Sequence, residues 1–312
     1  MSRSAVREDR RWVIPAVLAI IILPLLLVLL EAVTFHVENR NNGTLVSSGK
    51  TREYLLYVPA TYDRRKLTPL MISMHGAGML PAFQRDTSGW NKLADEYGFI
   101  VVYPAGRGVP KIFPMDGWRT PSQMPDVRFI SALIDTLTTT YNIDPARIYA
   151  DGLSNGGGMA FVLSCTLSGK IAAVGLVASA QLLPWKWCTE TRPMPMIALH
   201  GTADTFTPYD GGKTFIHSRP FPSIPGWATQ WAKRNQCAAN QAESMVAADV
   251  KRRAYTNCAD HADVVLYTIL GGGHTWPGGA LLPEWFVGKT NYNIDASRVE
   301  WAFFLEHPLS RK

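Results

Sequence analysis

Gly152-Leu153-Ser154-Asn155-Gly156 is the most informative segment of this chain. It has the spacing Gly-x-Ser-x-Gly, after an apolar run at 147–151 that favours a strand and before one at 159–163 that favours a buried helix. Strand, tight turn and helix are the context in which this motif holds a serine hydroxyl above a sheet. The glycines let the strand and the helix pass close together. The stretch therefore predicts an α/β fold with Ser154 as a nucleophile at the start of a helix.

Three further apolar runs favour strands, and each ends in a loop with a polar residue suited to ester chemistry. These runs are 69–74, 196–199 and 264–270. The first leads into His75-Gly76-Ala77-Gly78, a turn that in such sheets offers a backbone N–H to an oxyanion. The second leads to Asp204 and the third to His274. Each has an ordinary alternative: a plain turn, an Asx-turn or cap, and a loop histidine.

The order of these residues along the chain favours a catalytic role over the ordinary alternative for each residue. Ser154, Asp204 and His274 follow one another in the chain order of an α/β-hydrolase, and each comes after its own strand. The carboxyl ends of the strands in an open α/β sheet are where ligands bind. We therefore expect a catalytic triad there, with the backbone N–H groups of Ala77 and Asn155 around the oxyanion. This chemistry requires no metal and no cofactor.

The remaining pattern predicts a doubly wound, mainly parallel sheet with helices on both faces, because strands and helices alternate along the chain. Further strands are expected at 54–58 and 99–104. Helices are expected at 90–97, 126–141 and 296–306, and the second of these carries apolar residues at helical spacing. The chain is long enough to form one large α/β domain with a substantial core.

Four strings in the sequence resemble those of the esterase family that joins polyhydroxybutyrate depolymerases with feruloyl and acetylxylan esterases. The resemblance covers about residues 50–305, and its second and fourth strings are specific, whereas the first is shared with many hydrolases. The strings are His75-Gly76-Ala77-Gly78, Gly152-Leu153-Ser154-Asn155-Gly156-Gly157, His200-Gly201-Thr202-Ala203-Asp204 and Gly271-Gly272-Gly273-His274-Thr275-Trp276-Pro277-Gly278-Gly279. The resemblance implies an α/β-hydrolase fold.

The same resemblance implies a serine carboxylic-ester hydrolase that acts through an acyl-enzyme. Its substrates would be acyl or feruloyl esters of carbohydrates, or other short-chain esters. A polyhydroxybutyrate depolymerase is the second possibility, and an acyltransferase that uses the same triad is a rival from another class. A binding protein without catalysis is disfavoured by the intact triad.

Aromatic residues near the predicted triad are candidates for the walls of the substrate pocket. Aromatic faces suit a sugar ring or a feruloyl group, although packing in the core or at its rim is the ordinary role of such residues. The main candidates are Trp276, Trp118 and Tyr209, and further ones are Trp185 and Trp187.

The N-terminal segment from Trp12 to Leu30 has no charged residue and is just long enough, at about 1.5 Å per residue, to cross a ~30 Å hydrocarbon core. Four arginines precede it, so the positive-inside rule sends the rest of the chain across the membrane. A cleaved signal peptide, giving a secreted protein, is the alternative. The expected parts are a cytoplasmic tail at 1–11, a transmembrane signal anchor at 12–33, a polar linker at 34–49 and a catalytic domain at 50–312.

The charge of the chain does not indicate a nucleic-acid partner. The formal net charge is +6, but the basic residues are scattered, and their local groups are typical of solvated faces. We expect the partners to be a small-molecule or carbohydrate ester and, through the N-terminal helix, a membrane.

Four cysteines follow the predicted anchor, an even number that suits an exported protein. None forms a Cys-x-x-Cys pair, which argues against a zinc site, and spacing alone allows three pairings. The family resemblance favours a bridge between Cys237 and Cys258, which leaves Cys165 and Cys188 as the second pair. The alternative for Cys165 is a buried thiol in an apolar helix.

Overall fold

The computed structural model describes residues 40–107, 124–181, 183–189, 192–213, 220–239, 241–280 and 283–310. The chain divides into two units, Met1–Arg40 and Asn41–Lys312, and the first is described only at Arg40. The predicted tail and signal anchor therefore lie outside the described residues. Within the described ranges, no helix is both long enough and apolar enough to cross a membrane.

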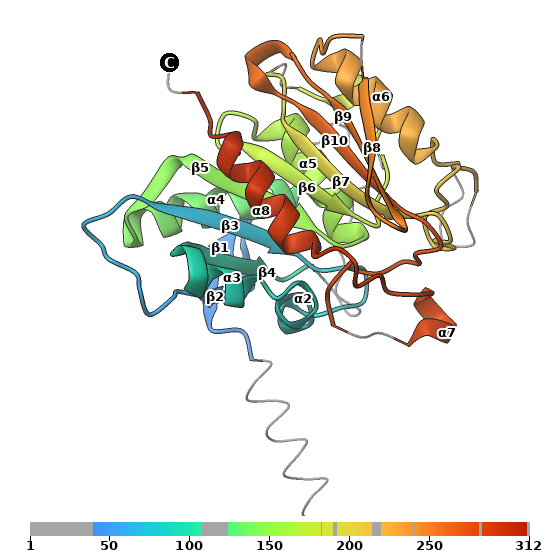
Figure 1. Ribbon diagram of the computed structural model, residues 1–312. Coiled ribbons are helices and arrows are strands. Elements are labelled where there is room, and N and C mark those ends of the chain that lie inside the picture. Colours follow the sequence, from blue (N-terminus) through green and yellow to red (C-terminus); the bar gives the residue numbers. More distant parts are fainter. Residues whose placement is uncertain are drawn as a thin grey trace, which may run out of the picture. The chain divides into compact units, whose positions relative to one another are not determined.

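Ten strands of the second unit form one sheet in the order β1-β2-β4-β3-β5-β6-β7-β10-β9-β8 (Figure 1). Six of them are mutually parallel, from β4 to β10 in this order, and the two pairs at the edges are antiparallel. The strands are β1 Gly43–Ser47, β2 Lys50–Tyr57, β3 Thr68–Met74, β4 Ile100–Pro104, β5 Ile143–Gly152, β6 Ala173–Val177, β7 Met196–Gly201, β8 Gln241–Ala247, β9 Val250–Tyr255 and β10 Val264–Ile269.

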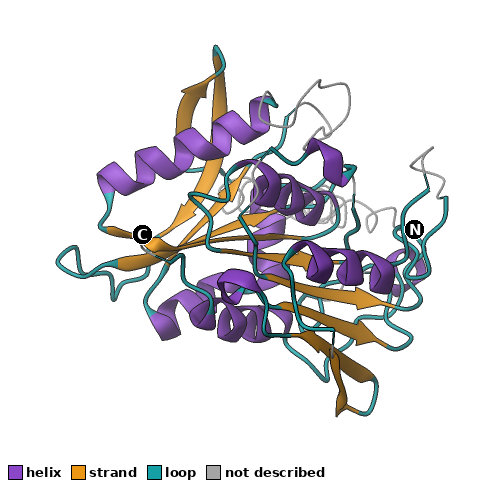
Figure 2. Ribbon diagram, turned by 90° about the horizontal axis from the view of Figure 1, so that it is seen from above, coloured by secondary structure: helices purple, strands orange, loops and turns teal. Residues whose placement is uncertain are grey.

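Helices cover both faces of this sheet, as Figure 2 shows from above. One hydrophobic core lies between the sheet and α4, α5 and α6, and the other lies between the sheet and α2, α3 and α8. The prediction of a doubly wound, mainly parallel sheet is therefore confirmed. The helices are α2 Pro81–Ser88, α3 Trp90–Tyr97, α4 Pro125–Thr140, α5 Asn155–Thr166, α6 Ile224–Arg234, α7 Glu284–Val287 and α8 Ala296–Glu306, with short 3-10 helices at η2 Trp185–Trp187 and η3 Ala259–His261.

The strand order reverses at β3. The chain leaves β3 for β4 on one side and later returns to β5 on the other side. In open α/β sheets the loops that leave such a reversal point diverge, and ligands bind in the crevice between them. The loops after β3 and β5 are those that carry His75 and Ser154, so the topology brings the first two sequence motifs to neighbouring positions.

The predicted linker at 34–49 is partly wrong, because its last residues form a strand. β1 pairs with β2 in an antiparallel hairpin that is closed by Ser48 and Gly49. Both turn residues have positive φ, 52° and 72°. This is what a two-residue type I′ turn requires, and such turns match the twist of the strands that they join. The folded unit thus begins before residue 50.

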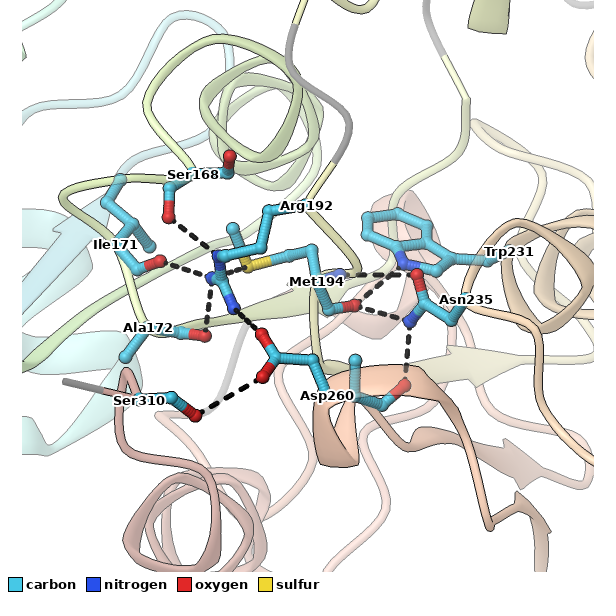
Figure 3. Close-up of polar contacts among 10 residues, drawn as sticks. Ser168, Ile171, Ala172, Arg192, Met194, Trp231, Asn235, Asp260 and Ser310 are labelled. Carbon is cyan, nitrogen blue, oxygen red and sulfur yellow. Dashed lines mark hydrogen bonds and ion pairs between the residues drawn. The ribbon is translucent and has the colours of Figure 1, made fainter. Parts of the chain in front are cut away.

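Both predicted disulfides, Cys237–Cys258 and Cys165–Cys188, are present. Near them a polar network holds the amino-terminal side of β7, opposite the end that carries Asp204 (Figure 3). The Asn235 side-chain amide donates to the Met194 and Ala262 carbonyls at 2.8 and 2.7 Å. The Arg192 guanidinium donates to the carbonyls of Ser168, Ile171 and Ala172. These bonds, like the disulfides, join segments far apart in the sequence into a scaffold under the site.

Candidate active site

Ser154 lies in a sharp turn between β5 and α5. Its backbone has φ 55° and ψ −116°, a combination outside the regions that non-glycine residues ordinarily adopt. The turn is held from both neighbouring strands, because the Ser154 N–H donates to the Val177 carbonyl at 2.9 Å and the Leu153 N–H to the Met74 carbonyl at 3.2 Å. This strained conformation is the one that the Gly-x-Ser-x-Gly motif predicts.

The two glycines of the motif are required by close contacts of the backbone. A Cβ atom at Gly156 would fall on the carbonyl of Met74 at the end of β3, and one at Gly152 would fall on the backbone of Gly156. Any side chain at either position would push α5 away from the sheet. The Ser154 hydroxyl itself is half-buried, and it has no hydrogen-bond partner among the described residues. It is therefore available to an incoming group.

Asp204 and His274 meet at the carboxyl ends of β7 and β10. His274 Nδ1 lies 2.8 Å from Asp204 Oδ2, and both side chains are buried. The other carboxylate oxygen accepts the backbone N–H groups of Phe206 and Thr207 at 2.9 and 2.8 Å, which fixes its orientation. An ionised carboxylate only accepts, so His274 donates from Nδ1. A neutral imidazole in this tautomer has its lone pair at Nε2.

The loops that carry Asp204 and His274 are joined through their backbones. The Ala203 N–H donates to the Gly272 carbonyl at 2.9 Å, and the His274 N–H donates to the Val287 carbonyl at 2.6 Å. A Cβ atom at Gly201 would fall on the Gly272 carbonyl, and one at Gly273 would fall on that of Val287. The glycines around Asp204 and His274 therefore allow the close approach that sets the spacing of these two residues.

A second histidine, His200, also contacts the Asp204 carboxylate. Its Nε2 atom donates to the Thr207 carbonyl at 2.7 Å and lies 3.4 Å from Asp204 Oδ2. Burial lowers the pKa of His200, against the opposing effect of Asp204, so a neutral ring is favoured. His200 was not expected at the site, and the sequence signal that could have indicated it is its position at the end of β7, four residues before Asp204.

The loop after β3 is fixed by His75, which is fully buried. His75 Nε2 accepts the Gly106 N–H at 2.9 Å, and Nδ1 lies 2.7 Å from the Gly76 carbonyl, to which it must donate. The Gly76 carbonyl and the Ala77 N–H belong to one planar peptide unit, so fixing the carbonyl also fixes the direction of the N–H. Ala77 is exposed, and its N–H has no partner among the described residues.

Asn155, the other residue expected at the oxyanion, follows Ser154 as the first residue of α5. The N-terminal end of a helix carries a partial positive charge, which stabilises an anion beside it. Ala77 and Asn155 thus follow the carboxyl ends of the neighbouring strands β3 and β5. No group of three His, Cys, Asp or Glu side chains in the described part of the chain could hold a metal ion.

The expected pocket residues have different fates. The expectation that Trp276 lines the pocket is wrong. Its side chain is 1% exposed and lies in the core beside α8, where Nε1 donates to Ser297 Oγ at 3.1 Å. Tyr209 is half-buried near His200, and its hydroxyl shares a hydrogen bond of 2.7 Å with Thr268 Oγ1. Trp118 lies outside the described residues.

Trp185 and Trp187 are partly buried and lie against the core on the α5 and α6 face of the sheet. The Trp185 ring has edge contacts with Phe161 and Trp231 at centroid distances of 5.1 and 5.3 Å. The ordinary alternative, packing at the rim of the core, therefore accounts for both residues.

Three aromatic residues that were not among the expected pocket residues form a row that begins at His274. Phe206 stacks on the His274 imidazole with ring centroids 4.9 Å apart, Phe286 contacts Phe206, and Trp285 contacts Phe286. Phe206 follows Asp204 by two residues, a proximity that could have marked it. Nothing in the sequence indicated Trp285 and Phe286, because their position depends on how the chain returns to His274.

Behind the Ser154 turn lies a buried pair of carboxyl groups, Asp151 and Glu300. Both side chains are fully buried, and Trp90 Nε1 donates to Asp151 Oδ2 at 2.7 Å. Burial raises the pKa of Asp151 to about 6. Burial, and then the neighbouring Asp151, raise the pKa of Glu300 well above its ordinary value. The pair therefore keeps at least one proton around neutral pH, since two adjacent buried carboxylates would repel each other.

Comparison with known proteins finds relatives of this chain among the esterases. The model of the family described as "Esterase PHB depolymerase", where PHB is polyhydroxybutyrate, matches residues 52–183. A protein of Nocardia uniformis subsp. tsuyamanensis named "Putative esterase NocK" is 30% identical over 262 residues, which are 75% of this chain and 73% of that protein. "Feruloyl esterase B" of Piromyces equi is 28% identical over 74% of this chain and 44% of its own length.

The fold also has counterparts among solved structures. An acetyl xylan esterase from Aspergillus awamori superposes with a TM-score of 0.54 over 72% of this chain and 89% of that one. The two sequences are 16% identical, so this likeness concerns the fold alone. The fold is that of the α/β-hydrolases, as expected from the Gly-x-Ser-x-Gly motif.

Proposed function

Because this chain belongs to the esterase family of polyhydroxybutyrate depolymerases, and is thus a carboxylic ester hydrolase, we propose that Ser154, His274 and Asp204 are its catalytic residues. The observation that carries this proposal is the 2.8 Å hydrogen bond from His274 Nδ1 to Asp204 Oδ2. It selects the tautomer in which Nε2 can accept a proton, which is the state that a general base needs.

In the proposed reaction, Ser154 Oγ attacks the ester carbonyl carbon while its proton passes to His274 Nε2. Asp204 stabilises the resulting imidazolium. The tetrahedral intermediate collapses when the alcohol leaves with the proton from His274, and the acyl group stays on Ser154 as an ester. Water, activated by His274 in the same way, then releases the acid and restores the serine.

The negative charge of each tetrahedral intermediate would be held by the backbone N–H groups of Ala77 and Asn155. Fixed donors aimed at the oxyanion typically contribute a rate factor of about 10²–10³. Two features support this assignment: the His75 contacts that fix the Gly76–Ala77 peptide, and the position of Asn155 at the N-terminal end of α5.

The substrates that we propose are acyl or feruloyl esters of carbohydrates, or other short-chain esters. Relatives with the names feruloyl esterase and acetylxylan esterase support this choice. Turnover of short polyhydroxybutyrate in preference to methyl ferulate and acetylated xylan would instead favour a polyester depolymerase. Acyl transfer is distinguished from hydrolysis by its products, because added glycerol would then be acylated.

The test of the catalytic residues is labelling with a fluorophosphonate, which reacts with activated serines. The unmodified protein should be labelled at Ser154 and should hydrolyse p-nitrophenyl butyrate. Ser154→Ala should lose the label and about 10⁴-fold or more in activity, while the exposed control Ser244→Ala should keep both. Normal turnover by a folded Ser154→Ala variant would refute the proposal.

We further propose that residues 12–33 anchor the protein in a membrane, with the catalytic domain outside the cytoplasm. The two disulfides support an oxidising compartment, where such bonds persist. Alkaline phosphatase fused after Lys50 should be active, because that reporter needs an oxidising compartment. An inactive fusion beside an active cytoplasmic reporter would refute the orientation, and a mature protein that starts near residue 33 would show that the segment is cleaved.

A further inference from the structure

We propose that Phe206, Phe286 and Trp285, which we call the aromatic row, bind an aromatic ring in the ester substrate. This inference rests on the function proposed above, since it concerns the same site. It assigns substrate selection to residues on the two loops that carry Asp204 and His274. Of the tryptophans and the tyrosine that the sequence suggested, those in the described ranges have no part in it.

The aromatic row starts on the proposed catalytic base. Phe206 stacks on the His274 ring with a centroid distance of 4.9 Å and an interplanar angle of 28°. Phe286 meets Phe206 edge to face at 5.2 Å, and Trp285 lies 5.7 Å from Phe286. These spacings lie within the range of favourable aromatic pairs. The end of the row at Phe206 therefore lies at the proposed base, and Phe286 and Trp285 extend the row outward from it.

The outer part of the row faces solvent. Trp285 is 87% exposed and Phe286 is 56% exposed. Large aromatic side chains release water from apolar surface when they are buried, and the other tryptophans of the described ranges are buried or partly buried. These two adjacent exposed rings continue from Phe206, which stacks on His274, and clustered apolar exposure of this kind is typical of ligand sites.

The rings are held in place by the backbone below them. Trp285 and Phe286 belong to α7, whose last residue, Val287, is buried. The Val287 carbonyl accepts the His274 N–H at 2.6 Å, and the Lys289 carbonyl accepts the Gly273 N–H at 2.9 Å. Because α7 is tied to the peptide of His274, the backbone that carries Trp285 and Phe286 keeps a set position relative to that residue.

The chemistry of the row favours an aromatic ring over other parts of an ester. Phe and Trp offer apolar faces and edges that pair with another ring in stacked or edge-to-face geometry. An acetyl group has no ring face or edge to pair with the row. The bound ring could belong to the acyl group, as in a hydroxycinnamate, or to the alcohol, as in a phenyl ester, and the experiment below separates these two sources.

The test compares esters with and without a ring in the full-length protein and in Trp285→Ala and Phe286→Ala. Methyl ferulate against methyl butyrate examines the acyl side, and phenyl acetate against ethyl acetate examines the alcohol side. On the side that binds the ring, kcat/KM should fall about tenfold, mainly through KM. The esters without a ring should change less than twofold, and Trp285→Phe should retain most of the selectivity.

The matched control is Tyr292→Ala, because Tyr292 is 58% exposed in the same part of the chain but has no place in the row. It should change none of the ratios. Equal losses on all four esters, no loss on any, or the same selectivity change in Tyr292→Ala would overturn the inference. Failure of the unmodified protein to hydrolyse any ester would instead refute the proposed function.

Discussion

The buried pair Asp151 and Glu300 leads to a prediction about stability against pH. Both pKa values are raised in the folded chain, from 3.8 to about 6 for Asp151 and well above 4.5 for Glu300. Raised pKa values mean that the folded protein holds protons that the unfolded chain releases. The stabilisation is therefore complete below about pH 4 and is lost as the pH rises through the folded values.

The size of the effect follows from proton linkage. Each proton held only by the folded state lowers the free energy of unfolding by about 1.4 kcal/mol per pH unit. The shift of Asp151 thus amounts to a loss of about 3 kcal/mol that is complete a little above pH 6. Above that pH only Glu300 still holds its extra proton, so the decline continues at about half its earlier slope.

Glu300→Gln removes one of the two protons and keeps the shape of the side chain. Relative to the unmodified protein, the variant should gain about 1.4 kcal/mol of stability with each pH unit above about 5. Urea unfolding of the full-length, oxidised protein in mild detergent at pH 5, 6, 7 and 8, followed by tryptophan fluorescence, measures this difference. Glu306→Gln, at the exposed end of the same helix, is the control and should not alter the slope. Parallel curves for Glu300→Gln and the unmodified protein would refute the reasoning.

Three further predictions concern the site and its scaffold. Asp204→Asn should lower kcat for p-nitrophenyl butyrate by about 10³-fold or more, because an amide at that position favours the wrong tautomer of His274; a loss below tenfold would argue against its role. His75→Phe should lower kcat by about 10- to 100-fold with little change in KM, since the Gly76–Ala77 peptide would no longer be fixed, and a change confined to KM would contradict this. The double variant Cys237→Ser with Cys258→Ser should lower the stability by about 3 kcal/mol, seen as a lower Tm in calorimetry, and an unchanged Tm would count against the bridge as a stabilising element.

The residues that could be found from the sequence are those whose position depends on local structure. Ser154 lies in a turn whose strand, glycines and helix are all close in the chain, and Asp204 and His274 each directly follow an apolar strand. The hairpin turn at Ser48 and Gly49 is also local. A Ser-Gly pair in a polar stretch is a weak turn signal, however, so the sequence does not distinguish β1 from a linker.

The errors in the site come from contacts that the local sequence does not decide. Trp276 is two residues from His274, yet its ring lies in the core between the sheet and α8. The chain turns toward α8 after Trp276, where the Ala296 N–H donates to the Pro277 carbonyl. Phe286 is twelve residues away and contacts Phe206. Its position depends on the backbone hydrogen bond between His274 and Val287, which no pattern of residue types predicts.

The bond between His274 and Val287 has a consequence for how relatives of this protein can diverge. It uses a main-chain carbonyl, which every amino acid supplies, so the neighbouring positions 285 and 286 can change without disturbing His274. Gly201 and Gly273 have no such freedom, because a methyl group at either would collide with the adjacent loop. New substrate preferences should therefore evolve through replacements in α7, a few mutations at a time, while the residues of the proposed triad stay unchanged.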